Sequence, residues 1–168
     1  LKEKGISPRY LESSGEGLSA AVLSHQKVAE YGVFTHEEEV HLAKTIWIQN
    51  IDHWTVKDID KPHRSPDKGM LPPKLARMMV NFVSQDIQAL SQKRLLDPFC
   101  GSATILMEGI ELGWTVIGSD LSQEAVTQAA ENLRWFTLQM GLPETYSLAC
   151  LDATQINKQS FNGTVHAI

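Results

Sequence analysis

The chain has 168 residues, of which 42% are hydrophobic and 21% charged, and its formal net charge at pH 7 is -5. This length and composition predict one globular domain, or one domain with an appended arm, and the negative charge excludes a nucleic-acid footprint over the whole surface. No apolar run approaches the roughly 18 residues of a membrane span, and no secretory leader is visible. We therefore expect no membrane association and a cytoplasmic location.

The first 60 residues are expected to form an N-terminal arm of mixed α and β structure. Residues 7–12, "SPRYLE", suggest a short strand, and residues 18–32, "LSAAVLSHQKVAEYG", predict a helix closed by Gly32. Residues 44–56, "KTIWIQNIDHWTV", are rich in β-branched and aromatic side chains and predict an extended segment. Residues 58–73 carry Lys-Pro, Ser-Pro and Lys-Gly turn signals, which are typical of a linker.

A local excess of positive charge stands out against the acidic chain. Between residues 61 and 77 there are five basic residues and one acid, Asp67; the basic residues are Lys61, Arg64, Lys68, Lys74 and Arg77. Such a run could contact phosphate groups. A solvated linker that contacts no phosphate is the alternative.

Three helices are predicted after the linker. Pro72 and Pro73 can open the first, because a proline at the first helical position loses no intrahelical hydrogen bond. The second should run from about residue 102 to 112, and the third should follow the N-cap Ser122 and stop at Gly141. An apolar stripe on the first helix is expected to be covered by a neighbouring element: Leu75, Met79, Phe82, Val83 and Ile87.

Short apolar runs separate the helices: "RLLDPF", "WTVIGSD", "YSLACLD" and "GTVHAI". Strands that alternate with helices predict βαβ units, and right-handed crossovers make their sheet parallel and cover it with helices. We therefore expect an α/β fold, a Rossmann-like doubly wound parallel sheet, over residues 61–168. Cys100 and Cys150 lie at or beside predicted strand ends, which favours reduced thiols. The six histidines lack the paired spacing of metal ligands, so no metal site is predicted.

Each of the first three predicted strands ends in a carboxylate: Asp97, Asp120 and Asp152. In an open parallel sheet, ligands bind beyond the carboxyl ends of the strands, near the switch point. Gly101 would let a ligand approach the backbone closely, and Asp120 follows Asp97 at a spacing suited to a ribose-binding acid. Taken singly, the three acids are explained equally well as a turn former, a helix cap and a loop residue.

The turn after the first strand, Asp-Pro-Phe-Cys-Gly-Ser-Ala-Thr, lacks the G-x-G-x-x-G pattern of dinucleotide sites. Its carboxylate would also repel a pyrophosphate, which disfavours a nicotinamide dehydrogenase. S-adenosylmethionine fits better, with its ammonium near Asp97, its ribose near Asp120 and its adenine near Asp152.

Residues 95–133, "LLDPFCGSATILMEGIELGWTVIGSDLSQEAVTQAAENL", resemble the motif region of class I S-adenosylmethionine-dependent methyltransferases. Residues 63–82, "HRSPDKGMLPPKLARMMVNF", resemble the segment that precedes it in tRNA guanosine N2-methyltransferases with a THUMP domain. The resemblance implies an RNA methyltransferase that acts on guanosine N2 in tRNA, a substrate of the whole protein.

The resemblance also implies roles for individual residues. Asp97, Pro98 and Gly101 would line the methionine end of S-adenosylmethionine; Asp120 and Leu121 would hold its ribose; Asp152 and Ala153 would border its adenine. Lys74 lies in a segment similar to one that closes over the cofactor, and a solvated lysine on a packing helix is the alternative. Ala103 stands where the family commonly has a second glycine. A positive φ there would cost alanine about 1 to 2 kcal/mol, whereas a helix-start conformation would not.

Family members that methylate an exocyclic amine carry an acid-or-asparagine, proline, aromatic signature directly after the fourth strand, and "GTVHAI" is the last printed segment. No catalytic residue is therefore assigned within this chain. We expect residues 61–168 to be a partial methyltransferase domain, truncated after the fourth strand and inactive alone, whose exposed edge favours association. The alternatives are an adenine N6-methyltransferase of RNA or DNA, and a non-catalytic cofactor-binding module that a partner completes.

Overall fold

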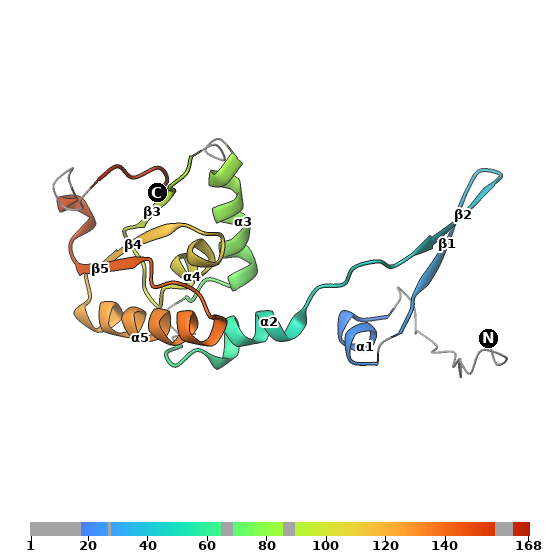
Figure 1. Ribbon diagram of the computed structural model, residues 1–168, viewed down its shortest axis with the longest axis horizontal. Coiled ribbons are helices and arrows are strands. Elements are labelled where there is room, and N and C mark those ends of the chain that lie inside the picture. Colours follow the sequence, from blue (N-terminus) through green and yellow to red (C-terminus); the bar gives the residue numbers. More distant parts are fainter. Residues whose placement is uncertain (1–17, 27, 65–68, 86–89, 157–162) are drawn as a thin grey trace. The chain divides into compact units, whose positions relative to one another are not determined.

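The computed structural model describes residues 18–26, 28–64, 69–85, 90–156 and 163–168 (Figure 1). The chain divides into two compact units, Leu1–Asp52 and His53–Ile168. The boundary falls within the arm that the sequence analysis extended to residue 60. Predictions for residues 7–12 and for Ile87 lie outside the described residues.

The described residues of the first unit form a short helix and a hairpin. Helix α1, Ala20–His25, begins after Ser19, whose hydroxyl accepts a hydrogen bond from the Val22 N–H. Strands β1, Tyr31–His36, and β2, Glu39–Lys44, pair in antiparallel register. The helix predicted to reach Gly32 is therefore wrong beyond His25, because Gly32 lies in β1. Cross-strand pairing of β-branched residues, such as Thr35 with Val40, favours the hairpin there.

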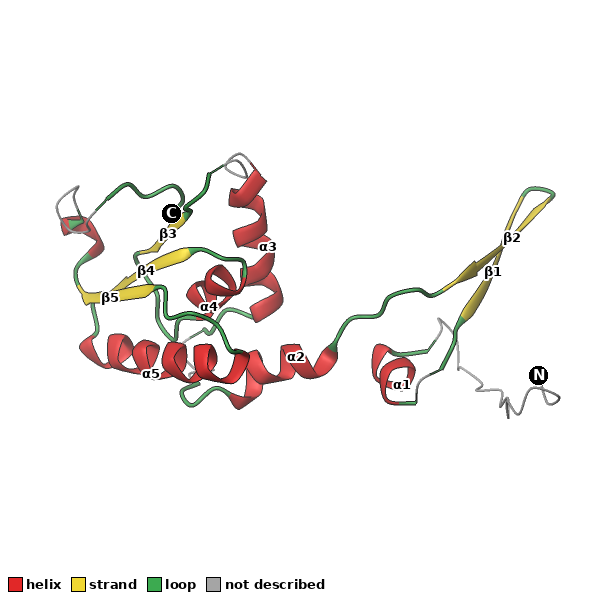
Figure 2. Cartoon of the chain, in the orientation of Figure 1, coloured by secondary structure: helices red, strands yellow, loops and turns green. Residues whose placement is uncertain are grey.

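The second unit is built on a parallel sheet (Figure 2). Strands β3, Arg94–Asp97, β4, Thr115–Asp120, and β5, Tyr146–Cys150, lie in the order β3-β4-β5. The α/β fold expected from the sequence is thereby confirmed. The predicted fourth strand appears among the described residues as a single parallel bridge, from Ala167 to Leu95, on the other edge of β3.

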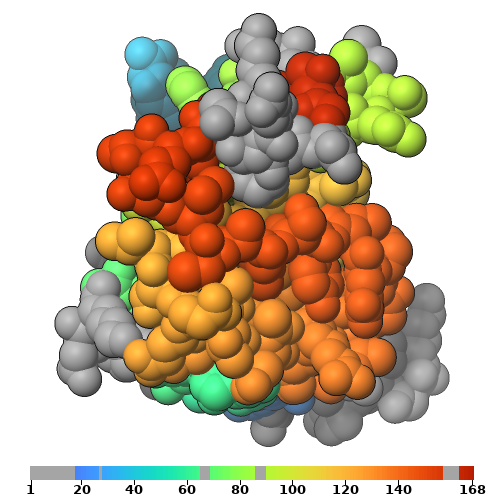
Figure 3. Space-filling model, turned by 90° about the vertical axis from the view of Figure 1, so that its left-hand side faces the viewer, coloured from blue at the N-terminus to red at the C-terminus, as the bar shows by residue number. Residues whose placement is uncertain are grey.

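Three helices accompany the sheet: α3, Pro73–Ser84, α4, Thr104–Glu111, and α5, Gln123–Met140. All three were predicted, and the caps match, with Ser122 accepting the Ala125 N–H before α5 and Gly141 ending it in a left-handed conformation. Figure 3 shows α5 and the chain that follows it forming one side of this unit.

The core joins one face of the sheet to these helices. Leu95 and Val116 pack with Leu106 of α4, Phe136 of α5 and Val80 of α3 in one buried cluster. Two glycines bring α4 close to the sheet. A Cβ at Gly109 would lie 2.8 Å from Val116 Cγ1, and one at Gly118 would lie 2.5 Å from Leu106 Cδ1. These separations are shorter than carbon contacts allow, so the layer spacing requires glycine at both positions.

The apolar stripe predicted on α3 packs only in part: Val83 packs against the core, whereas Leu75, Met79 and Phe82 are exposed. The buried residues of α3 are instead Pro73, Ala76 and Val80. The small Ala76 is fully buried, and α3 contacts α4. The sequence pattern favoured the large side chains, but close packing against a neighbouring helix selected the small ones.

The segment before α3 also departs from expectation. Instead of being extended up to residue 56, it forms α2, Ile51–Thr55, which continues as a π-helical turn, η2, Val56–Asp60. Lys57 is 1% exposed, and its Nζ lies 2.8 Å from Glu108 Oε1, 3.0 Å from Glu111 Oε2 and 3.9 Å from the centre of the Trp54 ring. This buried lysine fixes the segment to α4 and stabilises helix where local preference is for strand.

Arg77 of α3 completes this ion-pair network. Its guanidinium pairs with Glu108 and Glu111, and His53 Nε2 lies 2.9 Å from the other Glu111 oxygen. Burial raises the pKa of Glu111, but the hydrogen bonds from Lys57 and Arg77 outweigh it and lower this pKa. Among the residues that the structure describes, no helix is long and apolar enough to cross a bilayer.

We expect Lys57→Met to lower the free energy of unfolding by about 3 to 5 kcal/mol, because it leaves the buried Glu108 carboxylate with less compensation. The double variant Lys57→Met/Glu108→Gln should recover at least about 1 kcal/mol of that loss, since the uncompensated charge is gone. Urea unfolding followed by circular dichroism measures both. Lys74→Met, which alters an exposed lysine 5.9 Å from the same Trp54 ring, is the control and should change little. A double variant less stable than the single one would contradict the network.

Candidate functional site

The sheet has a switch point at β3. The chain runs from β3 to β4 and β5 on one side, and Ala167 then meets Leu95 on the other side. Backbone hydrogen bonds fix this contact: Leu96 N–H donates to Ala167 O over 2.9 Å, and His166 N–H to Arg94 O over 2.9 Å. In open parallel sheets, a crevice forms outside the carboxyl end of the strand at this point. Here that strand ends in Asp97.

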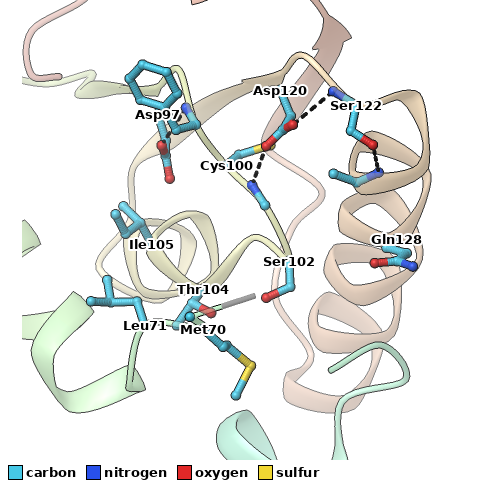
Figure 4. A pocket seen from close by; sticks show the side chains of 14 residues that line it. Met70, Leu71, Asp97, Cys100, Ser102, Thr104, Ile105, Asp120, Ser122 and Gln128 are labelled. Carbon is cyan, nitrogen blue, oxygen red and sulfur yellow. Dashed lines mark hydrogen bonds between the residues drawn. The ribbon is translucent and has the colours of Figure 1, made fainter. Parts of the chain in front are cut away.

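A pocket opens at this position (Figure 4). It is bordered by the β3–α4 turn, by the ends of β4 and the start of α5, and by the segment before α3. The lining residues are Gly69, Met70, Leu71, Asp97, Phe99, Cys100, Gly101, Ser102, Thr104, Ile105, Asp120, Ser122, Ala125 and Gln128. Among the residues that the structure describes, the lining contains two carboxylates and no basic side chain, which favours a ligand with positive charge.

The β3–α4 turn exposes backbone to this pocket. Gly101 has a φ of 48° and Ala103 a φ of 70°, both left-handed. The sequence left open whether Ala103 has a positive φ or a helix-start conformation, and the structure has the positive φ. Its cost for alanine is about 1 to 2 kcal/mol, and burial of the Ala103 methyl group in the core offsets part of it. The Cys100 N–H donates to Ser119 O of β4 over 2.9 Å and holds the turn against the sheet.

Asp97 is 8% exposed and directs one carboxylate oxygen into the pocket (Figure 4). Its Oδ1 accepts the Phe99 N–H over 3.1 Å. Burial raises the pKa of Asp97, the Phe99 hydrogen bond lowers it, and the neighbouring Asp120 charge raises it further. A buried carboxylate facing a second one gains most from a cationic ligand.

Asp120 ties two loops together at the end of β4. Its Oδ2 accepts the Gly101 N–H over 3.1 Å, and its Oδ1 accepts the Ser122 N–H over 2.9 Å (Figure 4). A carboxylate offers about four acceptor positions, so both oxygens can still accept hydrogen bonds from hydroxyl groups in the pocket. Asp120 therefore shapes the turn and remains available to a ligand.

The remaining predicted residues are more dispersed. Pro98, Leu121, Asp152 and Ala153 are not among the residues that line the pocket. Asp152 caps the 3-10 helix η5, Ala153–Gln155, by accepting hydrogen bonds from the N–H and hydroxyl of Thr154, which lower its pKa. Leu121 is 74% exposed beside the pocket residues Asp120 and Ser122. Their contacts with a cofactor stay predictions.

Lys68 of the basic run lies outside the described residues, and the described members of the run do not form a single phosphate-binding face. Lys61 is 3% exposed and Arg77 is held in the ion-pair network, whereas Arg64 is exposed. The Lys61 ammonium instead lies beneath the β3–α4 turn, with its Nζ 3.1 Å from Thr104 Oγ1 and 3.4 Å from Ser102 Oγ. The buried position of Lys61 fits neither of the two predictions for this run, a solvated linker or a contact with phosphate.

Like the contact of Lys61 with the turn, the role of Asn132 of α5 was not predicted from the sequence. Asn132 is fully buried, its Oδ1 accepts the His63 N–H, and its Nδ2 donates to the carbonyl oxygens of His63 and Ser102. A buried asparagine within an apolar helical face was the available signal, because such a side chain needs partners. Among the residues that the structure describes, no group of acids, histidines or cysteines could hold a metal ion.

The parallel sheet, the glycine turn and the two pocket carboxylates are the features that the resemblance to class I S-adenosylmethionine-dependent methyltransferases led us to expect. A family model described as "DNA methylase", the N6_N4_Mtase family, matches residues 8–131, which is more than half of the chain. The chain belongs to this family, and the resemblance seen in the sequence is confirmed.

Two curated relatives are tRNA (guanine(10)-N2)-dimethyltransferases. The protein from Methanothermobacter thermautotrophicus is 38% identical over 78 residues, which cover 45% of this chain and 22% of the relative. The protein from Pyrococcus abyssi is 31% identical over 130 residues, which cover 74% of this chain and 36% of the relative. The chain thus spans about a fifth to a third of the length of these relatives.

Two solved structures also resemble the chain. The tRNA (m1A58) methyltransferase TrmI from Aquifex aeolicus has a TM-score of 0.49 and 14% identity, over 76% of this chain and 59% of that chain. TrmN from Thermus thermophilus has a TM-score of 0.45 and 24% identity, over 74% of this chain and 33% of that chain.

We expect Asp97→Asn to raise the melting temperature at pH 7. Because burial raises the pKa of Asp97, the folded chain binds this proton more tightly than the unfolded chain, so the ionised carboxylate costs stability at neutral pH. That cost disappears as the pH falls through the raised pKa, and the advantage of the variant should shrink towards pH 4. Asp152→Asn is the matched control with the opposite sign, because the pKa of Asp152 is lowered. A lower melting temperature for Asp97→Asn at pH 7 would contradict this assignment.

Proposed function

We propose that the pocket binds S-adenosylmethionine and that the whole protein transfers its methyl group to the exocyclic N2 of guanosine in tRNA. The observation that carries the proposal is the buried Asp97 carboxylate, which lines the pocket together with Asp120 and, among the described lining residues, with no basic side chain. Such a site rejects phosphate groups and favours a ligand that carries a cation beside a sugar.

The residues present fit this cofactor. Asp97, Pro98 and Gly101 would border its methionine end, where the Asp97 carboxylate offers an ionic partner for an ammonium group. Asp120 and Leu121 would hold the ribose, because the Asp120 oxygens keep acceptor capacity beside the Gly101 backbone. Asp152 and Ala153 would border the adenine. When bound, the cofactor supplies an electrophilic methyl group.

What this chain contributes to the reaction is a fixed orientation. Effective transfer to a nitrogen requires the donor carbon and acceptor to be aligned, and rigid positioning supplies much of the rate gain. The hydrogen bonds from Gly101 and Ser122 to Asp120 hold the turn and the start of α5 in one arrangement. The exposed Phe99 and Leu121, beside Asp97 and Asp120 in the chain, are apolar groups available to an entering base.

Guanosine N2 of tRNA is favoured as the target because both curated relatives are named tRNA (guanine(10)-N2)-dimethyltransferases. An exocyclic adenine amine is the second candidate, because the matching family model is described as "DNA methylase". Both targets are amino groups conjugated with a ring, so the same cofactor site serves either one.

Calorimetric titration tests the cofactor. We expect the chain to bind S-adenosylmethionine and not NAD, and we expect Asp120→Ala to weaken this binding about tenfold or more, because hydrogen bonds to a charged group are lost together with the support of the turn. Asp152→Ala is the comparison variant beyond another strand end. Its affinity for S-adenosylmethionine measures how much the residue that would border the adenine contributes to binding. Binding of NAD in place of S-adenosylmethionine by a folded sample would overturn the proposal.

Nucleoside analysis tests the target. In tRNA from cells that lack the whole protein, we expect N2-methylated guanosine to fall at a specific position, with N6-methyladenosine unchanged in RNA and DNA. The intact protein should restore the modification, and a form carrying Asp97→Ala should not. Loss of N6-methyladenosine with unchanged guanosine modification would favour the second candidate.

A further inference from the structure

We infer that Lys61 is a positioning residue for the carboxylate of S-adenosylmethionine, acting through the hydroxyls of Ser102 and Thr104. The inference rests on the proposed function, since it concerns the same pocket. It assigns a role to a buried cation that the pocket lining does not include, and it explains how an acidic pocket accepts a ligand that itself carries a carboxylate.

The geometry joins Lys61 to the pocket by a single layer of side chains. Its Nζ donates to Thr104 Oγ1 over 3.1 Å and lies 3.4 Å from Ser102 Oγ. Both hydroxyl-bearing residues line the pocket, and the Ser102 hydroxyl points towards Thr104 in Figure 4. The Lys61 residue is 3% exposed and does not line the pocket, so it acts on a ligand by way of these groups.

Hydrogen-bond roles then follow from the donor. An ammonium has three protons and no acceptor, so both hydroxyl oxygens accept from it, and their own protons are free to be donated into the pocket. A hydroxyl that accepts from a cation is a stronger donor, because neighbouring hydrogen bonds polarise one another. Ser102 and Thr104 are thus prepared to bind an anion and not a cation.

Local energetics argue against a purely structural role. The ammonium lies at the N-terminus of α4, where the helix dipole disfavours positive charge. Burial lowers the pKa of Lys61 to about 8, Asp58 opposes this shift and Arg64 adds to it. A buried cation beside a helix start is costly in the free chain, and an anionic group of a ligand is the partner that would offset this cost.

The backbone around Lys61 is fixed in place. Asn132 binds both the N–H and the carbonyl of His63 and also the carbonyl of Ser102, so the segment that carries Lys61 and the turn that it contacts share one clamp. Distances between the ammonium and the two hydroxyls are therefore set before a ligand arrives, which is what a positioning role requires.

A pair of ligands separates this role from simple stabilisation. S-adenosylmethionine and its decarboxylated form differ in the carboxylate, and calorimetric titration can be carried out with each. We expect Lys61→Met to weaken binding of S-adenosylmethionine about ten- to a hundredfold and to change binding of the decarboxylated form less than about threefold. Arg64→Met, which removes an exposed charge from the same segment, should leave both affinities unchanged.

Each outcome decides something different. Equal weakening of both ligands by Lys61→Met would overturn the inference, because a structural role does not distinguish them, and would leave the proposed function intact. Failure of the wild-type chain to bind S-adenosylmethionine would overturn the proposed function itself. Should Lys61→Met not fold, as judged by its melting curve, the double variant Ser102→Ala/Thr104→Ala tests the same route and should show the same selective loss.

Discussion

The β3–α4 turn depends on hydrogen bonds supplied from other elements. Of its two left-handed residues, Ala103 is paired locally, with Cys100 O and the Met107 N–H, whereas the N–H of Gly101 is bound from β4. Ser119 O binds the Cys100 N–H, Asp120 binds the Gly101 N–H, and Asn132 binds the Ser102 carbonyl. The pocket is consequently a product of tertiary structure, and its shape requires the complete packed layer.

Charge is distributed unequally along α4. Near its C-terminal end, Glu108 and Glu111 are matched by Lys57 and Arg77 within the protein, and this buried set joins three helical segments. At its N-terminal end, Lys61 faces hydroxyls that border the pocket. One end of the helix thus has its charges balanced internally, and the other end is arranged for a partner from outside.

Much of the second unit could be predicted from the sequence, because its signals are local. Apolar runs gave β3 to β5, and Ser122 and Gly141 mark the ends of α5. The packing face of α3 and the helix at residues 51–60 could not be predicted, because they depend on contacts with α4 that no periodicity encodes. Asp97 and Asp120 could be predicted at strand ends, because the strands are visible as apolar runs. Lys61 was interpreted as part of a basic run, because its contact with Ser102, 41 residues later in the chain, depends on the fold.

The close approach of α4 to the sheet has a consequence for how sequences of this kind can vary. A Cβ at Gly118 would meet Leu106 and Leu148 and would also lie 3.1 Å from the Cβ of Cys100, in the pocket turn. A side chain at Gly118 would therefore force Leu106 and Leu148 to repack and would press on Cys100 of the pocket turn. Phe99 and Leu121, exposed beside the same site, have no such restriction. Substitutions can therefore accumulate at the rim of the pocket while the packed layer beneath it is kept.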